Sequence, residues 1–457
     1  MQRVRFPSVL NEMIPARELT VVCEKHAPQP RTRPKISATQ VVTGLIFHQL
    51  HDAGTLADPS GQLHGVRMSD SAYAQRRQLL PGELFEEIML TALQPLADES
   101  RQPECFYEGY RLLGIDGTQW SVSNTPAILE QLPKAASRRL QAAFAKLRLV
   151  CAIELETHAP VAAVAAAASE WEQTLAKRLW ERVPGNSLVI ADRLFGAART
   201  LDEALSGTAG RDVAFLLRIR DNIGTQVLER LPDGSALVQV PVREGSRIVK
   251  QLKVREIRAK GIGANGKRFT LRLWTTLADP KRYAAASLAR QYAERWEHEL
   301  YYRELKLDVR SAPVLASHTV ETALQEVAAL VLASAVIARV RVQTADGLKT
   351  PARRLSFYKL LLATRQLWAA FELAGGSFPP PARQRIRENY MENVRYTAIL
   401  PERRARSCLR VLRQPVRKWP RKGDQPSFTG KAQIASWCVP EVIMTSNSLN
   451  LPYRHCA

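Results

Sequence analysis

The sequence has few cysteines and no apolar run long enough to cross a bilayer. Its 457 residues include 6 cysteines, none of which forms a Cys-x-x-Cys pair, a pattern that favours reduced intracellular thiols over a disulfide framework. The most apolar segment, residues 322–340, is interrupted by Gln325 and Glu326, whereas a spanning helix needs about twenty apolar residues. We therefore expect a buried core helix there, no membrane partner, and a cytoplasmic protein.

Acidic residues are scarce relative to basic ones. Lys and Arg total 65 against 44 Asp and Glu, a formal net charge of +21. Such an excess indicates a polyanionic partner, with nucleic acid ahead of an anionic membrane surface, and disfavours a two-carboxylate glycoside hydrolase. The apolar content of 46% and the charged content of 24% are those of a globular protein, and the length suffices for two or three domains.

Residues 1–100 are predicted to be helical. The first clear helix covers residues 37–54, with Ser37 as its N-cap, and two more follow at 69–81 and 82–99. The stretch at 53–68 has a loop-like composition. The basic pair Arg76-Arg77 on the second of these helices has two open interpretations, a solvated face and a face that meets DNA.

A mixed α/β region follows from about residue 105, because apolar runs of strand length alternate there with an amphipathic helix. The strand candidates at 147–155 and 160–168 are joined by four residues and should form a hairpin. The strand-rich part at 212–279 contains the turn signals Asp233-Gly234 and Asn265-Gly266. The other predicted elements are strands at 110–120 and 187–196, a helix at 169–185, and helices at 281–308 and 322–340.

Residues 341–457 are predicted to be helical at first and then polar. The segment 401–422 holds nine basic residues and one acid. Such a segment is either a solvated run or a contact for phosphates, and the sequence leaves both open. The part after about residue 423 matches no pattern and is open to being a disordered tail.

Two aspartates occupy positions where an ordinary strand would not place them. Asp116 interrupts the apolar run LLGIDGT, and burying a lone carboxylate costs several kcal/mol, so it needs a partner. Asp192 ends the run LVIAD, at the strand end where open α/β sheets bind ligands. Either one alone could be a turn former or an N-cap. Both in one predicted sheet favour a metal or acid/base site.

The predicted helix at 281–308 carries four polar residues in the spacing Y-x2-R-x3-E-x6-K: Tyr292, Arg295, Glu299 and Lys306. On a regular helix they share an arc of about 60°. An adjacent apolar stripe would dock this helix on the sheet, and its members are Ala289, Ala293, Trp296, Leu300 and Leu307. The alternative is an exposed face with Arg295 and Glu299 as an i,i+4 ion pair.

Together these motifs resemble the DDE transposases of bacterial insertion sequences, in particular the insertion sequence 4 family, which is marked by a Tyr-Arg-Glu-Lys helix. The resemblance covers GIDGTQW, LVIADRLFG and the signature helix, within residues 105 to 340. It implies a ribonuclease-H-like mixed α/β sheet with a β-rich insertion. The implied regions are an N-terminal helical, DNA-end-binding region (1–100), a catalytic domain (101–340) with its insertion at about 212–279, and a C-terminal helical and basic region (341–457).

The resemblance also implies the catalytic residues. Asp116, Asp192 and Glu299 would form the DDE triad and hold two divalent ions. Three carboxylates can bind a pair of ions about 3.5–4 Å apart, and hard oxygen ligands suit Mg²⁺ or Mn²⁺.

By the same resemblance, Tyr292, Arg295 and Lys306 would contact the DNA backbone, and Trp274 in the insertion could hold a flipped base, although an aromatic in a strand is more often core. The implied protein is a cut-and-paste transposase in the bacterial cytoplasm, associated with the nucleoid when bound to DNA. It would bind the terminal repeats of its element, act as a homodimer on double-stranded DNA, and cleave and join strands. The alternative is a transposase-derived DNA-binding protein that has lost catalysis, which the presence of all three acids disfavours.

Overall fold

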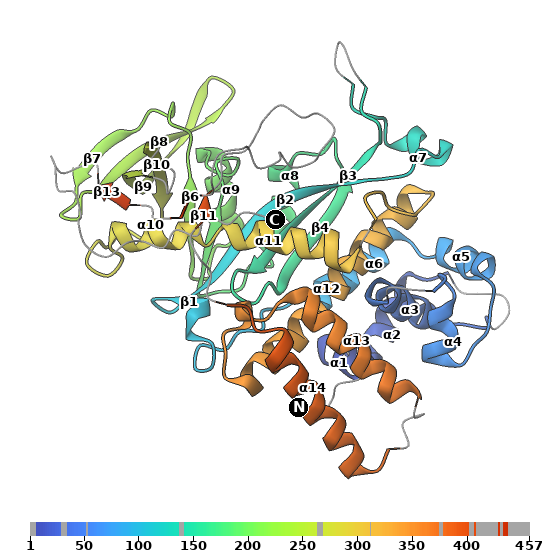
Figure 1. Cartoon of the computed structure of the whole chain (residues 1–457). Helices are drawn as coiled ribbons and strands as arrows, with labels where there is room; N and C mark the ends of the chain where they lie inside the picture. Colours follow the sequence, from blue (N-terminus) through green and yellow to red (C-terminus); the bar gives the residue numbers. More distant parts are fainter. Residues whose placement is uncertain are drawn as a thin grey trace. The chain divides into compact units, whose positions relative to one another are not determined.

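The computed structural model forms two compact units (Figure 1). The first unit consists of Met1–Cys105, Ile115–Pro184 and His298–Leu400, and the second of Phe106–Gly114, Gly185–Glu297 and Pro401–Ala457. The structure describes residues 6–28, 34–51, 54–136, 141–262, 268–310, 312–373 and 378–401, and the short strands β11 (Arg406–Ser407), β12 (Phe428–Thr429) and β13 (Gln433–Ser436). Most of the basic segment at 401–422 and the residues from 437 onward lie outside this description.

The N-terminal part of the first unit is helical, as predicted. Its helices are α1 (Phe6–Met13), α2 (Ala16–His26), α3 (Ala38–Leu50), α4 (Asp58–His64), α5 (Asp70–Gln78) and α6 (Gly82–Ala92). Ser37 caps α3 in a full capping box with Gln40, as its position before the apolar run indicated. The loop expected at 53–68 is wrong, because α4 lies within it. Pro59 lies in the first turn of α4, and Gly65, at φ 67°, directly follows its last residue. Proline at a helix start and glycine at a helix end are typical signals.

Arg77 is buried, with an exposed fraction of 7%, so it lies neither on a solvated face nor on one that meets DNA. Its guanidinium donates to Gln325 Oε1 at 2.8 Å, to Ser317 Oγ at 3.0 Å, and to the carbonyl of Thr322. These contacts join α5 to the start of α12 (Val320–Leu348). The guanidinium therefore stabilises the packing of the N-terminal helices, a role that no local sequence pattern indicates.

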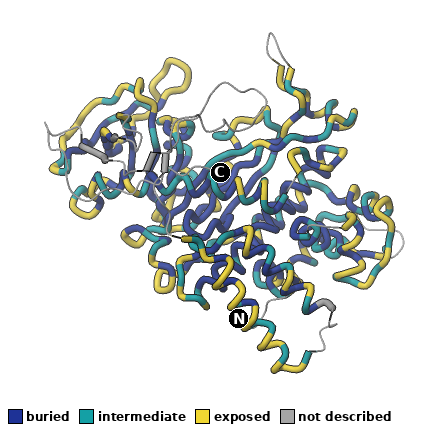
Figure 2. Tube along the Cα trace, viewed as in Figure 1, coloured by how far each residue is buried: buried dark blue, intermediate teal, exposed yellow. Residues whose placement is uncertain are grey.

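Three neighbouring strands lie in the first unit: β2 (Tyr110–Ser121, from Ile115 onward), β3 (Lys146–Glu154) and β4 (Pro160–Ala167). β3 and β4 form the predicted antiparallel hairpin, with Leu147 opposite Ala167. Other helices of the unit include η1 (Pro103–Cys105), α7 (Pro126–Gln131), α8 (Glu172–Trp180), η3 (Ala352–Arg354), α13 (Phe357–Leu373) and α14 (Pro380–Thr397). Figure 2 shows the buried residues along the sheet strands, whereas α14 is mostly exposed.

Helix α12 is the core of the first unit and contacts α3, α6 and β4. By length and composition it could cross a membrane, but 89% of its most apolar window is buried inside the protein. Gln325 and Glu326 are buried with it, and both are hydrogen-bonded, as buried polar groups must be. The prediction of a buried core helix is confirmed.

The second unit is rich in strands. It contains β1 (Phe106–Tyr107), the start of β2, β5 (Ser187–Ala191), α9 (Ala198–Gly207), β6 (Val213–Arg218), β7 (Gln226–Arg230), β8 (Ala236–Glu244), β9 (Arg247–Ile262) and β10 (Arg268–Thr275). β5 and β6 are parallel, and the pairs from β6 through β10, β9 and β8 to β7 are antiparallel. β13, in the segment that matched no pattern, pairs with β9. This confirms the β-rich insertion.

Three details of the insertion have different outcomes. The turn at Asp233-Gly234 joins β7 to β8, with Gly234 at φ 83°, as predicted. The turn expected at Asn265-Gly266 lies outside the described residues. Strand β7 has no predicted counterpart, because all five of its residues are exposed and it lacks an alternating apolar pattern.

The single helix predicted at 281–308 is wrong. The chain forms α10 (Ala285–Ala293), then α11 (Trp296–Arg303), and then a π-helical segment η2 (Glu304–Val309). Both interruptions shift the angular phase, so the wheel of one regular helix does not apply. Leu307, expected in the apolar stripe, is 54% exposed. The buried positions near it are instead Tyr301, Tyr302 and Leu305.

The fold class is confirmed as mixed α/β. The chain runs from β2 into the antiparallel hairpin β3–β4, then through α8 to the parallel strands β5 and β6. A β-rich segment is inserted before α10 and α11. This is the order expected of a ribonuclease-H-like domain with an insertion.

Candidate active site

Asp116 lies in β2 between a buried apolar stretch and a glycine. Ile115 is fully buried and Asp116 is half-buried, and the Gly117 amide donates to Asp116 Oδ1 at 2.8 Å. A Cβ on Gly117 would lie 2.7 Å from Cγ of Glu172, in the first turn of α8. A further carboxylate side chain therefore lies against the residue after Asp116, and it would have to turn away from any larger residue at position 117. No motif or spacing in the sequence indicates Glu172 as a neighbour of Asp116.

Glu299 lies on α11 between two residues that fix this helix to the sheet. The buried His298 donates from Nε2 to the carbonyl of Cys151 on β3 at 3.0 Å. Tyr302 donates its hydroxyl to the backbone carbonyl of Asp116 at 2.6 Å. Burial raises the pKa of Tyr302 well above its ordinary value, so the phenol stays a neutral donor. The strand that carries Asp116 and the helix that carries Glu299 are therefore directly bonded.

Lys306 lies on the π-helical segment and is held on β2. Its Nζ donates to Thr118 Oγ1 and, at 2.9 Å, to the carbonyl of Gln119. The same Nζ lies 5.3 Å from the centre of the Trp120 ring, within cation–π range. The ammonium therefore lies along β2 just beyond Asp116.

The second unit holds the other three residues. Asp192 directly follows β5, and its Oδ1 accepts from the Leu194 amide at 2.7 Å in a tight turn. Burial raises the pKa of Tyr292 to about 12, with Arg295 and Arg218 opposing the rise and Asp192 adding to it. The Arg295 guanidinium lies 5.4 Å from the centre of the Trp296 ring. The Tyr292 phenol therefore lies within electrostatic range of the Asp192 carboxylate and of the Arg295 and Arg218 guanidiniums.

The same turn explains Gly196 in the motif LVIADRLFG. A Cβ at this position would lie 2.9 Å from the carbonyl carbon of Arg218 and closer still to its oxygen. The clash is with backbone, which cannot rotate away. The glycine therefore allows the chain after Asp192 to pass directly over the end of β6.

The six predicted residues thus divide between the units. Asp116, Glu299 and Lys306 belong to the first unit. The second unit contains Asp192, Tyr292 and Arg295. Over the part of the chain that the structure describes, no three or more His, Cys, Asp or Glu side chains are grouped as a metal site.

Trp274 is a core residue. It is 1% exposed, and its Nε1 donates to Glu256 Oε2 at 3.1 Å. Glu256 also pairs with Arg272 at 2.9 Å and with Arg258. Burial acts to raise the pKa of Glu256, but these three donors outweigh it and lower the pKa below its ordinary value. The indole is committed to this network and is not presented to a base.

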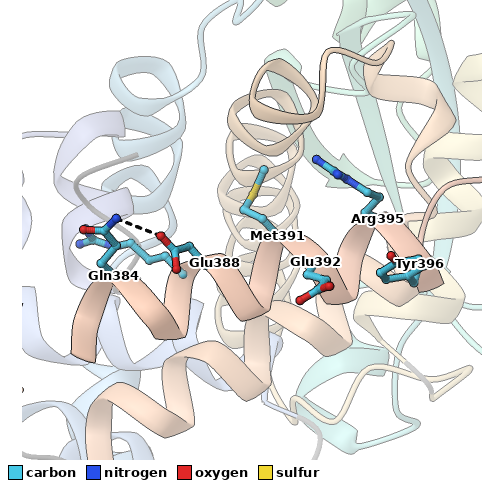
Figure 3. Close-up of a pocket in the computed structure, with 7 residues that line it drawn as sticks. Gln384, Glu388, Met391, Glu392, Arg395 and Tyr396 are labelled. Carbon is cyan, nitrogen blue, oxygen red and sulfur yellow. Dashed lines mark hydrogen bonds between the residues drawn. The ribbon is translucent and has the colours of Figure 1, made fainter. Parts of the chain in front are cut away.

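A pocket lies on α14 (Figure 3). It is lined by Gln384, Arg387, Glu388, Met391, Glu392, Arg395 and Tyr396. Gln384 donates to Glu388 at 2.9 Å, which stabilises the helix surface itself. None of the residues that the sequence singled out lines this pocket.

Comparison with known proteins agrees with the motif residues. A family model described as the transposase DDE domain matches residues 107–333, a range that contains all six predicted site residues. The transposase InsG for insertion sequence element IS4 of Escherichia coli (strain K12) is 25% identical over 356 residues, which cover 77% of this chain and 78% of InsG.

Among solved structures, one match is a cryo-EM structure of the piggyBac transposase synaptic complex with hairpin DNA. Its TM-score is 0.42 at 9% identity, over 87% of this chain and 84% of that chain. The family match, the InsG match and the motifs around Asp116, Asp192 and Glu299 agree with one another. The chain therefore belongs to the DDE transposases of the insertion sequence 4 family, which are DNA-cutting and strand-transferring enzymes.

Proposed function

We propose that this transposase binds the terminal repeats of its own insertion sequence and performs cut-and-paste transposition with Asp116, Asp192 and Glu299 as its catalytic carboxylates. The observation that carries the proposal is the hydrogen bond from Tyr302 to the Asp116 carbonyl. It joins the helix of Glu299 to the strand of Asp116 and so favours joint action of these two acids. Asp192, at the end of β5, supplies the third.

The donor chemistry of these residues fits two Mg²⁺ or Mn²⁺ ions. All three offer hard carboxylate oxygens, which such ions prefer. Backbone amides orient the carboxylates of Asp116 and Asp192 through one oxygen each. When bound, the ions would activate the attacking water or hydroxyl and stabilise the leaving oxygen. The chain's own part is to hold the carboxylates and to position the DNA.

Tyr292, Arg295 and Lys306 are the proposed contacts to DNA phosphates near the cleaved bond. With its pKa near 12, the phenol of Tyr292 keeps its proton at neutral pH and can donate it in a hydrogen bond. Arg295 offers a planar fork of donors and Lys306 a point charge, both of which suit phosphate. Cations beside the carboxylates also reduce the repulsion between these acids and the DNA backbone.

The remaining regions have more general proposed roles. Residues 1–100 would bind the ends of the element, residues 101–340 would carry catalysis, and residues 341–457 would add basic contacts to DNA. The excess of 65 Lys and Arg over 44 Asp and Glu supports double-stranded DNA as the partner. We further propose that two copies pair in a synaptic complex, and that the protein works in the bacterial cytoplasm.

The test is cleavage of a labelled duplex that carries the element's own end, with wild type compared with Glu299→Gln. The isosteric amide removes a ligand charge and leaves the helix intact. We expect wild type with Mg²⁺ or Mn²⁺ to nick the end and join it to a second DNA, a chelator to stop the reaction, and the variant only to bind.

Two results would overturn the proposal in different ways. If both proteins bind the end and neither cuts with either ion, the chain is a DNA-binding protein that has lost catalysis. If Glu299→Gln cuts as fast as wild type, the assignment of the triad is wrong, although the enzyme class stands.

A further inference from the structure

The π-helical segment η2 begins at a carboxylate that is bonded to two other elements of the first unit. π-helical segments are rare and often lie at functional sites. Glu304, the first residue of η2, places Oε2 2.7 Å from Nδ1 of His158 and Oε1 3.4 Å from Nη1 of Arg341. One carboxylate thus connects η2 to the β3–β4 turn and to α12.

Both partners are themselves fixed. His158 is buried in the turn with φ 57°, and its amide donates to the carbonyl of Glu154 at 2.9 Å. Arg341 is also buried and donates to the carbonyls of Ala352 at 2.9 Å and Leu355 at 2.8 Å. The Glu304 carboxylate therefore binds to groups that cannot move with η2.

Lys306, two residues further along, points elsewhere. Side chains two apart on a helical segment do not face each other, and Lys306 contacts Thr118 and Gln119 on β2 instead. The same short segment is thus held to the turn and α12 through Glu304, and to the strand of Asp116 through Lys306. Its wider helical turn sets the angle between these two contacts.

We propose that His158, Glu304 and Arg341 form a positioning cluster that fixes η2. In this position the Lys306 ammonium lies beside Asp116 and binds a DNA phosphate. The inference rests on the proposed function, because it assumes that Lys306 contacts DNA during cleavage by Asp116. None of the three residues of the positioning cluster touches DNA. They act through Lys306.

The test is a double-mutant cycle between Glu304→Gln and Lys306→Ala, with single-turnover cleavage of the element end at saturating protein. Glu304→Gln alone should slow cleavage about tenfold, in the range of coupling between groups that act through one another. In the Lys306→Ala background it should add less than about a twofold change. A purely structural role would slow cleavage by the same factor in both backgrounds and would overturn the proposal.

Glu154→Gln is the matched control. Glu154 lies in the same unit, at the end of β3 in the hairpin that contains His158, and is more deeply buried than Glu304. It accepts from the Leu96 and Ala97 amides and from Thr157. Any effect of this variant on cleavage should be the same in both Lys306 backgrounds. Coupling to Lys306 as large as that of Glu304 would overturn the specific role of the positioning cluster.

A second pair of variants guards against misfolding of Glu304→Gln. Asn tolerates the left-handed conformation that His158 adopts and keeps a donor, so His158→Asn should cleave faster than His158→Ala at equal folded fraction. Equal rates would contradict the positioning role. If Lys306→Ala cleaves like wild type, the proposed contact of Lys306 with DNA fails and the cluster proposal with it. If Lys306→Ala is slow but uncoupled, only the cluster proposal fails.

Discussion

Tyr302 donates its hydroxyl to the backbone carbonyl of Asp116 over 2.6 Å, and the side chain of Tyr302 is buried where it does so. A tyrosine three residues after the proposed catalytic Glu299 thereby bonds to the main chain of the proposed catalytic Asp116. The bond does not involve either carboxylate. It can therefore be removed while all proposed metal ligands stay in place.

Tyr302→Phe should lower both stability and cleavage. Loss of one buried hydrogen bond costs about 1 kcal/mol of unfolding free energy, because the Asp116 carbonyl loses a donor. We also expect slower single-turnover cleavage, since α11 is no longer bonded to β2, while binding of the DNA end stays the same. Urea unfolding, gel-shift and cleavage assays measure the three quantities.

The control is Tyr301→Phe, on the neighbouring position of α11. Tyr301 is as deeply buried, but its hydroxyl lies 3.2 Å from that of Ser334 on α12 and bonds neither β2 nor Asp116. It should lose similar stability and keep its cleavage rate at equal folded fraction. Equal cleavage losses in the two variants would show that α11 needs only general packing.

Much of the fold follows from local sequence, and those predictions are confirmed. Ser37 before an apolar helix, the short link between β3 and β4, and Asp192 at the end of β5 are signals contained within a few residues. Each is decided by capping, turn or strand chemistry in its own neighbourhood. Tertiary contacts do not compete with them.

The signature helix shows where local signals end. No glycine or proline marks the interruption at Glu294 and Arg295 or the start of η2. Bonds from distant segments decide the backbone there, in particular Tyr302 to Asp116 and Glu304 to His158. The residue types of the candidate site could therefore be predicted from the sequence, whereas the angles between them could not.

Gly117→Ala should destabilise the first unit by about 1 kcal/mol, the low end of the cost of overpacking. The added Cβ would overlap the Glu172 side chain, which must turn away and give up its ion pair with Arg148 at 3.7 Å. The measurement is the midpoint of urea unfolding. Cleavage at equal folded fraction should change little, because the Glu172 side chain can move without a shift of the strand that carries Asp116.

The double variant Gly117→Ala/Glu172→Ala tests the cause directly. Trimming Glu172 removes the atoms that the new Cβ meets, so Gly117→Ala should cost little in that background. If the cost of Gly117→Ala is unchanged when Glu172 is absent, the glycine is needed for another reason, such as its backbone conformation.

Trp274→Phe should destabilise the second unit without a specific effect on DNA. The variant leaves Glu256 with one donor fewer in a buried site, a loss of about 1–2 kcal/mol. At equal folded fraction, we expect end binding and cleavage to match wild type. A selective loss of cleavage with unchanged stability would instead indicate that the indole contacts DNA.

Asp308 predicts a pH dependence of stability. Burial, and next the negative charge of Glu304, raise the pKa of Asp308 from 3.8 to about 6, against the effect of Arg303. Between these values the folded protein holds a proton that the unfolded chain has released, so wild type loses stability as the pH rises from about 4 to 6. Asp308→Asn has no such proton to lose. It should be more stable than wild type by about 1 kcal/mol above pH 6, and the difference should vanish near pH 4.

Asp98→Asn provides a control of opposite sign, because hydrogen bonds from Ser100 lower the pKa of Asp98. The stabilisation from this carboxylate is present above its unfolded pKa and is lost as the pH falls through the folded pKa. Asp98→Asn should therefore be less stable than wild type at neutral pH, with a gap that closes on acidification. Thermal unfolding of both variants between about pH 2 and 8 separates the two cases. Asp308→Asn should become more stable than wild type as the pH rises above about 4, whereas Asp98→Asn should be less stable than wild type at neutral pH and approach it only below about pH 4. If Asp308→Asn instead follows Asp98→Asn, then Arg303 rather than burial and Glu304 governs the Asp308 carboxylate.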